Sequence, residues 1–406
     1  MRYAAPGVYV REVASGIRPI SSIGTSTAAF VGTALNGAYL DEARAINNWS
    51  EFMRTYVGDE RTTNLLAGAV AGFFQNGGSR CYIVNIADGA PLAGTTLRTG
   101  LQALDAIDDI SILAAPGRTS PDDHQALLAH CEQEQRLDRV AILDPPETVD
   151  DIARLTEVAT ATAPAPGAGG GTEPSGSSPR STGLRPPQSE FGALYFPWLV
   201  APDPLTGATV TIPPSGHVAG IWARTDATRG VHKAPANESV RMATGLTYQV
   251  ARQEQESLNP AGVNCIRYFP REGIKVWGAR TLADQSSEFR YLNIRRLFIM
   301  LRESIAAGTR WIVFEPNDER LWNSITCNIR AFLTQVWRDG ALMGNTPEQA
   351  FFVKCDAETN PPESRDEGQV VTVIGVAPIK PAEFVLFEIT QHHPDAALES
   401  LGGRRG

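Results

Sequence analysis

The stretch TTNLLAGAVAGFFQNGG (62–78), followed by CYIVNIAD (81–88), decides the fold class of this chain of 406 residues. In the first segment Leu66, Val70 and Phe73 recur at helical spacing and two glycines mark the end, so the pattern predicts an amphipathic helix. The second segment is a short continuous apolar run, which predicts a buried strand. A helix that leads into a buried strand is the unit from which α/β domains are built.

Further segments of the same kind lie on both sides of this pair. The apolar stretches STAAFVGTA, DISILAAPG and RVAILDPP predict strands at 26–34, 109–117 and 139–146. Helices are expected at 121–137 and 149–160. Residues 25–160 are therefore predicted to form an α/β domain, in which helices cover a sheet.

Residues 161–188 differ in composition from both flanks. The tract is rich in Pro, Gly, Ser and Thr and holds few large apolar side chains. Such a composition cannot bury enough surface to fold by itself. We therefore expect an exposed loop between the two halves of the chain.

The second half of the chain shows a different pattern of predicted helices and strands. SEFGALYFPWLV (189–200) predicts a strand, and SGHVAGIWARTDATRG (215–230) predicts a helix capped by Ser215. VNCIRYFPREGIKVWGART (263–281) has the pattern of a hairpin that turns at PREG. This part of the chain therefore mixes helices with antiparallel strands.

The last third combines two helices with short strands. An amphipathic helix is expected at 295–308, and a longer one at about 318–337, capped by Asn317 or Asp318. Strands are expected in WIVFEP (311–316), AFFVKCD (350–356), QVVTVIGVAPI (369–379) and EFVLFEITQ (383–391). Residues 189–380 are thus predicted to form an α+β domain.

Composition argues against several classes of function. Hydrophobic residues make up 42% of the chain and charged residues 20%, and the formal net charge is −9. Nucleic-acid binders usually concentrate Lys and Arg, so this balance disfavours them. The N-terminus lacks the apolar core of a signal peptide, and no run approaches the roughly 20 apolar residues of a membrane helix. We expect synthesis in the cytoplasm, any later exit by lysis or another signal-independent route, and neither a nucleic-acid nor a membrane partner.

Motifs for enzyme chemistry are missing from the sequence. GxxxxGK[ST], GxSxG and HExxH do not occur, and the run GAGGG at Gly167 lies inside the low-complexity tract. A polar tract holds His217, Arg224, Asp226 and His232, which we interpret as a helix end fixed by hydrogen bonds and salt bridges in preference to a catalytic cluster. We predict no catalytic residue, and hence no enzyme.

Cofactor and metal sites are not predicted either. Five cysteines are scattered singly, which disfavours a disulfide framework and a structural zinc site; they are Cys81, Cys131, Cys265, Cys327 and Cys355. We expect them to be buried thiols. The pair His392 and His393 fits a solvated tail better than a metal site.

Several blocks of the sequence together resemble the phage tail sheath family. In the second half they are ALYFPWL, PPSGHVAGIWARTDATRGVHKAPAN, LNPAGVNCIRYFP, VWGARTL, RRLFIMLRESIAAGTRWIVFEPND and GVAPIKPAEF. In the first half PGVYVREV, GTSTAAFVG and FFQNGGSRCYIV agree. The tract around Gly169 departs from the family.

The resemblance implies a structural subunit. It predicts a sheath of stacked hexameric rings around an inner tube, which contracts to drive the tube through a target envelope, with the tube protein, baseplate and cap or terminator proteins as partners. It also implies extended arms that neighbouring subunits build into an intermolecular sheet. We place these arms at 1–24 and 381–406.

The ends of the chain agree with such arms by their own composition. GVYVREV and EFVLFEITQ are rich in β-formers and lack obvious local strands to pair with, and an unpaired strand is a liability. Both ends packing within their own subunit is the alternative. The predicted arm residues are Val8, Tyr9, Val10 and Val13 at the N-terminus and Phe384, Val385, Leu386, Phe387 and Ile389 at the C-terminus, with Val371, Val373 and Ile374 in the acceptor sheet.

Contact with the inner tube is placed on the long helix. Arg320, Arg330 and Arg338 would give it a basic face that could grip an acidic tube surface, and a solvated helix face is an equal alternative. Two other functions stay open. One is a soluble α/β enzyme with an unrecognised site, and the other is a different tail or baseplate subunit.

Overall fold

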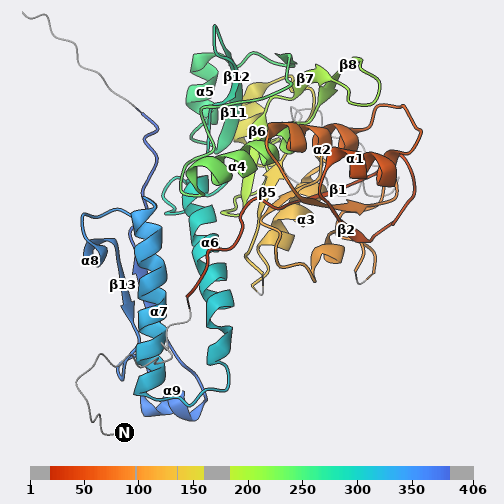
Figure 1. The fold of residues 1–406 in the computed structure, drawn as a ribbon. Coiled ribbons are helices and arrows are strands. Elements are labelled where there is room, and N and C mark those ends of the chain that lie inside the picture. Colours follow the sequence, from red (N-terminus) through yellow and green to blue (C-terminus); the bar gives the residue numbers. More distant parts are fainter. Residues whose placement is uncertain (1–18, 97, 135, 160–182, 385–406) are drawn as a thin grey trace, which may run out of the picture.

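A nine-stranded sheet forms the centre of the larger part of the molecule, which we call the body (Figure 1). The computed structural model describes residues 19–96, 98–134, 136–159 and 183–384. The strand order is β2-β3-β1-β4-β5-β6-β11-β12-β9, and the strands from β3 to β11 in that order are parallel. The strands are β1 (Ala28–Gly32), β2 (Ala43–Ile46), β3 (Cys81–Asn85), β4 (Ile112–Ala114), β5 (Val140–Leu143), β6 (Gly192–Phe196), β9 (Glu238–Ser239), β11 (Val263–Phe269) and β12 (Gly273–Val276).

The sequence explains why these strands lie in the middle of the fold. β1, β4, β5 and β6 are continuous apolar runs in which every residue is buried. Parallel strands are covered on both faces, so they need apolar side chains at every position. The expected α/β organisation is therefore present.

The sheet corrects the expected division of the chain. β6 pairs in parallel with β5 on one side and with β11 on the other, so it joins strands from both predicted domains. The boundary predicted between 25–160 and 189–380 divides one sheet, because the tract at 161–188 is an insertion between two neighbouring strands. The composition of residues 161–188 distinguishes this insertion from its flanks, but it could not show that β5 pairs with β6 on its other side.

Helices of the body cover this sheet. They are α1 (Trp49–Phe52), α2 (Leu65–Asn76), α3 (Pro121–Cys131), α4 (Ser215–Arg229) and α5 (Arg252–Leu258), with a π-helical turn at Met53–Val57 and 3-10 turns at Gly100–Leu104 and Ile152–Thr156. The Asn64 side chain caps α2, and Gly77 ends it in a left-handed conformation with φ of 116°. The helix expected at 149–160 is only the short 3-10 turn, and α3 ends at Cys131, six residues earlier than predicted.

The helix α4 is capped by a residue that its own sequence does not reveal. Ser215 is the first helical residue, and both its backbone N and its Oγ donate to the Asp144 carboxylate, at 2.9 and 2.7 Å. Burial raises the pKa of Asp144 to about 6, against the lowering effect of the bonds from Ser215 and from the Gly117 backbone. The predicted cap at Ser215 is thus replaced by an acid at the end of β5.

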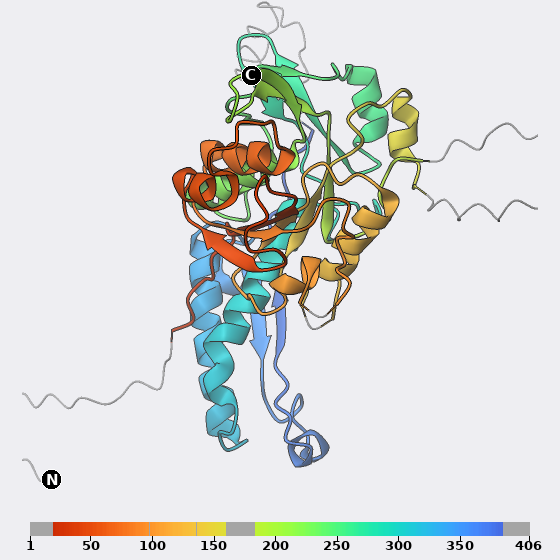
Figure 2. The same ribbon diagram turned by 90° about the vertical axis from the view of Figure 1, so that its right-hand side faces the viewer.

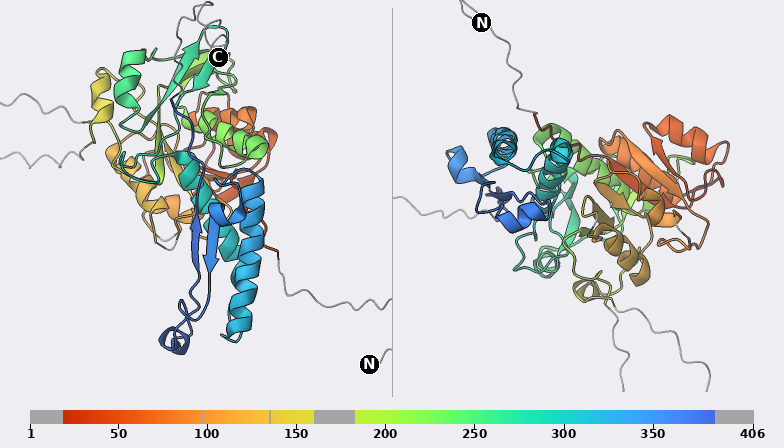
Figure 3. Two further views of the ribbon diagram at one scale, coloured as in Figure 1. Left: turned by 90° about the vertical axis from the view of Figure 1, so that its left-hand side faces the viewer. Right: turned by 90° about the horizontal axis from the view of Figure 1, so that it is seen from below.

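A second lobe projects from the body and is built from residues 292–384 (Figure 2). Its two long helices lie side by side, as the end-on view in Figure 3 shows, and a two-stranded sheet packs beside them. The elements are α6 (Leu292–Thr309), a 3-10 turn (Arg310–Ile312), α7 (Glu319–Arg338), α8 (Pro347–Ala350), β13 (Phe351–Lys354), α9 (Pro362–Asp366) and β14 (Val373–Val376). The lobe has its own apolar cluster, while Leu292 and Ile299 of α6 belong to the cluster of the body.

The strand predicted in WIVFEP is absent from the lobe. The segment forms the turn between α6 and α7, where Phe314 is fully exposed and has a φ of 71°. Its apolar composition suggested a buried strand, but Trp311 and Ile312 are only half-buried against the cluster of the lobe, and Val313 and Phe314 are exposed. The predicted cap of α7 is confirmed, because the Asp318 side chain accepts from the Leu321 backbone N.

Smaller elements complete the body. The strands β7 (Leu199–Pro202), β8 (Thr209–Ile212) and β10 (Gly245–Leu246) form a three-stranded sheet, so the predicted strand 189–200 is split in two around a cis peptide bond before Pro197. The hairpin predicted at 263–281 is confirmed as β11–β12. Across the described ranges, no helix is long and apolar enough to cross a membrane.

Candidate intersubunit interface

The small sheet of the lobe is the acceptor predicted from the sequence, and its strands alternate between two environments. Phe351 pairs with Val376 and Val353 with Ile374, and these four side chains pack into the cluster formed with α7. On the opposite face Phe352 is 56% exposed and Val373 is 44% exposed. The outer face of this sheet is therefore open, and it presents Phe352 and Val373 beside the charged Lys354.

The edges of the same sheet are also open. β13 and β14 pair only with each other in the described part of the chain. A two-stranded sheet by itself is marginally stable, and free edges present backbone N–H and C=O groups that another strand can pair with. Both strands of this sheet are edge strands in the described part of the chain, so the sheet can accept a further strand along either of them.

The three predicted acceptor residues are not equivalent. Val373 and Ile374 lie in β14. Val371 lies before it, and its backbone N and O are both bonded to the side chain of the buried Asn360, at 2.6 and 3.0 Å. We therefore expect an incoming strand to pair along β14 itself and not at Val371.

The predicted arms lie mostly outside the described residues. This applies to Val8, Tyr9, Val10 and Val13, and to Val385, Leu386, Phe387 and Ile389. Phe384 is described and is 79% exposed. The pair His392 and His393 also lies outside the described ranges.

The described root of the N-terminal segment runs along α6. Ile20 is buried and packs on Gly308, where any Cβ would lie 2.6 Å from the Ile20 side chain. The Ile23 backbone N donates to the Ser304 hydroxyl at 3.0 Å. The first described residues are thus fixed to the lobe before the chain enters the body.

A buried ion pair holds Thr25, two residues further along the same segment. Arg296 and Asp226 have side chains that are 3% and 5% exposed, and Arg296 makes hydrogen bonds of 2.5 and 3.0 Å to the two carboxylate oxygens. Thr25 joins them, since its hydroxyl donates to Asp226 and its carbonyl accepts from Arg296. The sequence did not lead us to predict this triad. Asp226 in α4 and Arg296 in α6 are charged residues on the apolar faces of their helices, and this placement could have indicated a buried pair.

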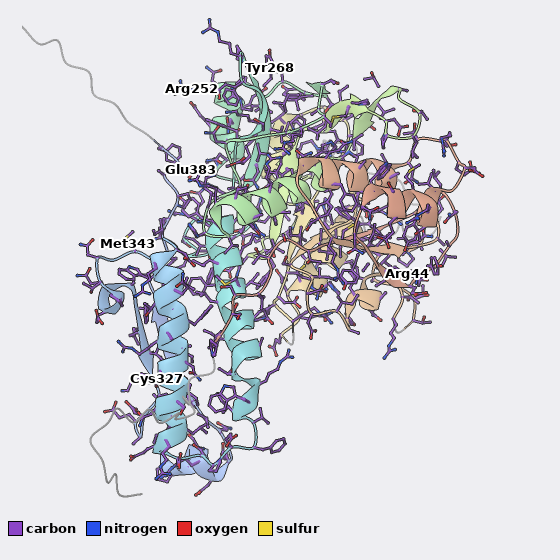
Figure 4. All side chains as sticks on the ribbon, viewed as in Figure 1. Arg44, Arg252, Tyr268, Cys327, Met343 and Glu383 are labelled. Atoms are coloured by element: carbon purple, nitrogen blue, oxygen red, sulfur yellow. The ribbon has the colours of Figure 1, made fainter. Side chains whose placement is uncertain are left out.

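The arginines of α7 lie on its outer surface. Arg320, Arg330 and Arg338 are all exposed, and Arg330 lies 3.8 Å from Glu348 in a contact between two largely exposed side chains. At 3.6 residues per turn, Arg320 and Arg338 fall on one line and Arg330 about 80° to its side. Glu319 is the one acid in α7. The helix, whose middle is marked by Cys327 in Figure 4, therefore presents a basic outer face on an acidic chain.

The polar tract considered for catalysis does not converge on a common point. His217 is buried against Gly72 of α2, Arg224 donates to the carbonyls of Asn76 and Ser239, and Asp226 belongs to the pair with Arg296. The His232 carbonyl accepts from Asn293. The interpretation as a hydrogen-bonded helix end agrees with these contacts.

The cavities of the body are small. One of about 150 Å³ lies beside Glu147, Phe196 and Tyr248, below the usual size of a ligand pocket. The described residues hold no group of three or more His, Cys, Asp or Glu side chains placed to bind a metal. Of the cysteines, Cys81, Cys131, Cys265 and Cys355 are buried as predicted, whereas Cys327 is exposed on α7.

Two models of known protein families match this chain. The model of the phage tail sheath protein central domain matches residues 95–282, and the model of the phage tail sheath C-terminal domain matches residues 284–392. The chain belongs to the phage tail sheath family. Members of this family are structural sheath proteins and not enzymes.

One relative of known name aligns with only part of this chain. The tail sheath protein of Vibrio phage KVP40 is 28% identical over 195 residues, which are 47% of this chain and 28% of that protein. The chain thus spans less than a third of that relative's length.

Solved sheath structures match nearly the whole fold of this family member. The sheath of an extracellular contractile injection system, the PVC sheath complex in its contracted state, has a TM-score of 0.76 at 29% identity and covers 97% of this chain and 99% of that one. The contracted helical sheath of the anti-feeding prophage has a TM-score of 0.72 at 28% identity, covering 96% and 100%.

Proposed function

We propose that this chain is the subunit of a contractile sheath that polymerises around an inner tube and shortens to drive the tube through a target envelope. The open two-stranded sheet of the lobe carries this proposal, because it leaves two edges and the exposed side chains of Phe352 and Val373 for strands of other subunits. The near-complete match to subunits of contracted sheaths supports it.

Donated strands are the proposed joints between subunits. Residues 1–24 and 381–406 are the proposed arms, and β14 is the acceptor edge. Each backbone hydrogen bond of an added strand contributes roughly 1 kcal/mol net. Several such bonds hold two subunits together while each body moves as a unit, as contraction by rearranged packing requires.

Stacked hexameric rings, a baseplate at one end and a cap or terminator at the other complete the proposed assembly. Similarity to chains in the anti-feeding prophage baseplate structure supports a baseplate neighbour. We further propose that the subunit is made in the cytoplasm and that the particle is released by lysis. Work would come from the free-energy difference between two packings, without a nucleotide.

Removal of residues 1–15 tests the proposed joints. The truncated subunit should keep the melting temperature of the full chain, because it retains Ile20 and Ile23, which fasten the chain to α6, but should form no ordered tubes in negative-stain images. Full-length chain prepared in parallel is the control. Tubes of normal length from the truncated chain would exclude the N-terminal arm as a joint.

The basic face of α7 is the proposed contact with an acidic surface of the inner tube. The triple variant Arg320→Glu, Arg330→Glu and Arg338→Glu should still polymerise but should no longer enclose co-expressed tubes. Arg252→Glu, at an 89% exposed side chain of the body, is a control for the change of charge. Normal tube enclosure by the triple variant would assign the contact to another surface.

A further inference from the structure

The C-terminal segment is fastened to the body at one side chain, Glu383. Its carboxylate accepts from Arg280 through two parallel bonds, Nε at 2.9 Å and a terminal nitrogen at 2.6 Å. It also accepts from the Asn259 amide at 2.8 Å and from the Tyr291 hydroxyl at 3.3 Å. All three donors belong to the body, whereas Glu383 follows the last strand of the lobe.

Glu383 is less exposed than its neighbours in the sequence. Lys380, Ala382 and Phe384 are exposed, while the Glu383 side chain is 20% exposed. Burial alone would raise the pKa of Glu383, but the bonds from Arg280 and Asn259 outweigh it, so the pKa lies below the usual range. The carboxylate is therefore ionised and held by charge-assisted bonds at neutral pH.

The receiving arginine is itself fixed to the central sheet. The Arg280 backbone N donates to the Asn264 side-chain oxygen at 2.7 Å, and the Asn264 amide donates to the Arg280 carbonyl at 2.8 Å. Asn264 lies in β11, is fully buried, and donates also to the Leu194 carbonyl of β6 at 3.1 Å. A continuous chain of hydrogen bonds thus runs from Glu383 to two neighbouring strands of the nine-stranded sheet.

We propose that the Arg280–Glu383 pair is the anchor of the C-terminal arm, which fixes where the arm leaves the body and passes the load on the arm into the central sheet. The inference rests on the proposed function, since it concerns the same donated arm. The segment is therefore held to the body as far along the chain as Glu383. In Figure 4 Glu383 lies between Arg252 of the body and Met343 of the lobe, at the level where the two parts meet.

The anchor predicts separate effects on folding and on assembly. The Glu383→Gln variant of the full chain should melt close to the parent, because the sheet and both apolar clusters are untouched. Hydrogen exchange at residues 380–384 should accelerate by about tenfold or more, since the loss of a charge-assisted bond changes a local opening equilibrium by that order. The yield of ordered sheaths should fall by a similar factor.

Two further variants make the test specific. Exchange of the charges, Arg280→Glu with Glu383→Arg, should restore part of the protection and of the assembly that either single change removes. Glu190→Gln breaks another Glu–Arg pair, between Glu190 of the body and Arg295 of α6, which does not involve the C-terminal segment, and this variant should assemble normally.

The outcomes separate this inference from the proposed function. Normal sheaths and unchanged exchange in Glu383→Gln would overturn the anchor and leave the sheath function standing. Failure of the parent chain to form any tube would overturn the sheath function itself.

Discussion

The body and the lobe bury their apolar side chains in different ways. In the body, strands of the nine-stranded sheet are flanked on both sides, and residues of β1 and β5 have almost no exposed surface. In the lobe, one face of α7 and one face of β13–β14 form the cluster, and Phe352 and Val373 remain outside it. Among the described residues, the lobe therefore leaves apolar side chains of its small sheet exposed, whereas β1 and β5 of the body do not.

The buried ion pair between Asp226 of the body and Arg296 of the lobe gives the largest expected loss of stability. Arg296→Met leaves Asp226 buried without its cation, and breaking a buried pair in this way costs about 3–5 kcal/mol. Urea unfolding of the unassembled subunit measures this. Lys354→Gln, at an exposed pair with Glu358 inside the lobe, should cost less than about 1 kcal/mol. Equal losses of unfolding free energy in the two variants would mean that the Arg296–Asp226 pair does not hold the body and the lobe together.

The same substitution in the two sheets compares them directly. Ile83→Ala removes a fully buried side chain of β3 and should cost about 2–5 kcal/mol. Ile374→Ala removes a half-buried side chain of β14 and should cost about 1 kcal/mol in the unassembled subunit. Denaturation midpoints give both values. A cost at Ile374 as large as that at Ile83 would contradict the view that the lobe is open.

Acid should weaken the body more than the lobe. Burial lowers the pKa of His217 to about 4, and its Nδ1 has no hydrogen-bond partner among the described residues. The unfolded chain therefore binds this proton first, near pH 6.5, so stability is present above that pH and is lost as the pH falls toward 4. The slope is at most about 1.4 kcal/mol per pH unit for one group.

A neutral replacement isolates this contribution. His217→Gln should flatten the dependence of the unfolding free energy on pH between about 6.5 and 4. Residues 292–384 contain no histidine, so the lobe offers no group of this kind. An unchanged slope in His217→Gln would assign the acid sensitivity to other groups.

The turn of the lobe gives the smallest effect. Phe314 has a φ of 71° and a fully exposed side chain, so its replacement loses no packing. Asn tolerates this left-handed conformation better than Phe, and Phe314→Asn should stabilise the unassembled subunit by about 0.5 kcal/mol. Thermal unfolding detects this as a small rise in the melting temperature. A drop would show that the Phe314 ring contacts the folded chain.

Local signals in the sequence determined much of the fold. The strands at 26–34, 81–88, 109–117 and 139–146, the helix that ends at Gly77 and the capped helix from Asp318 were all predicted, because apolar spacing and capping act within a few residues. Family resemblance supplied the sheath interpretation in addition. The arms stay predictions, since most of their residues lie outside the described ranges.

The tertiary structure decided which distant segments meet. The pairing of β5 with β6 across residues 161–188, the capping of α4 by Asp144 and the pairs of Arg296 with Asp226 and Arg280 with Glu383 join residues separated by about 50 to 100 positions. No local pattern encodes such contacts, because each depends on where two whole elements come to lie. For the same reason, WIVFEP was predicted as a strand from its composition, yet it forms the turn between α6 and α7, where Trp311 and Ile312 pack against the cluster of the lobe and Phe314 is exposed.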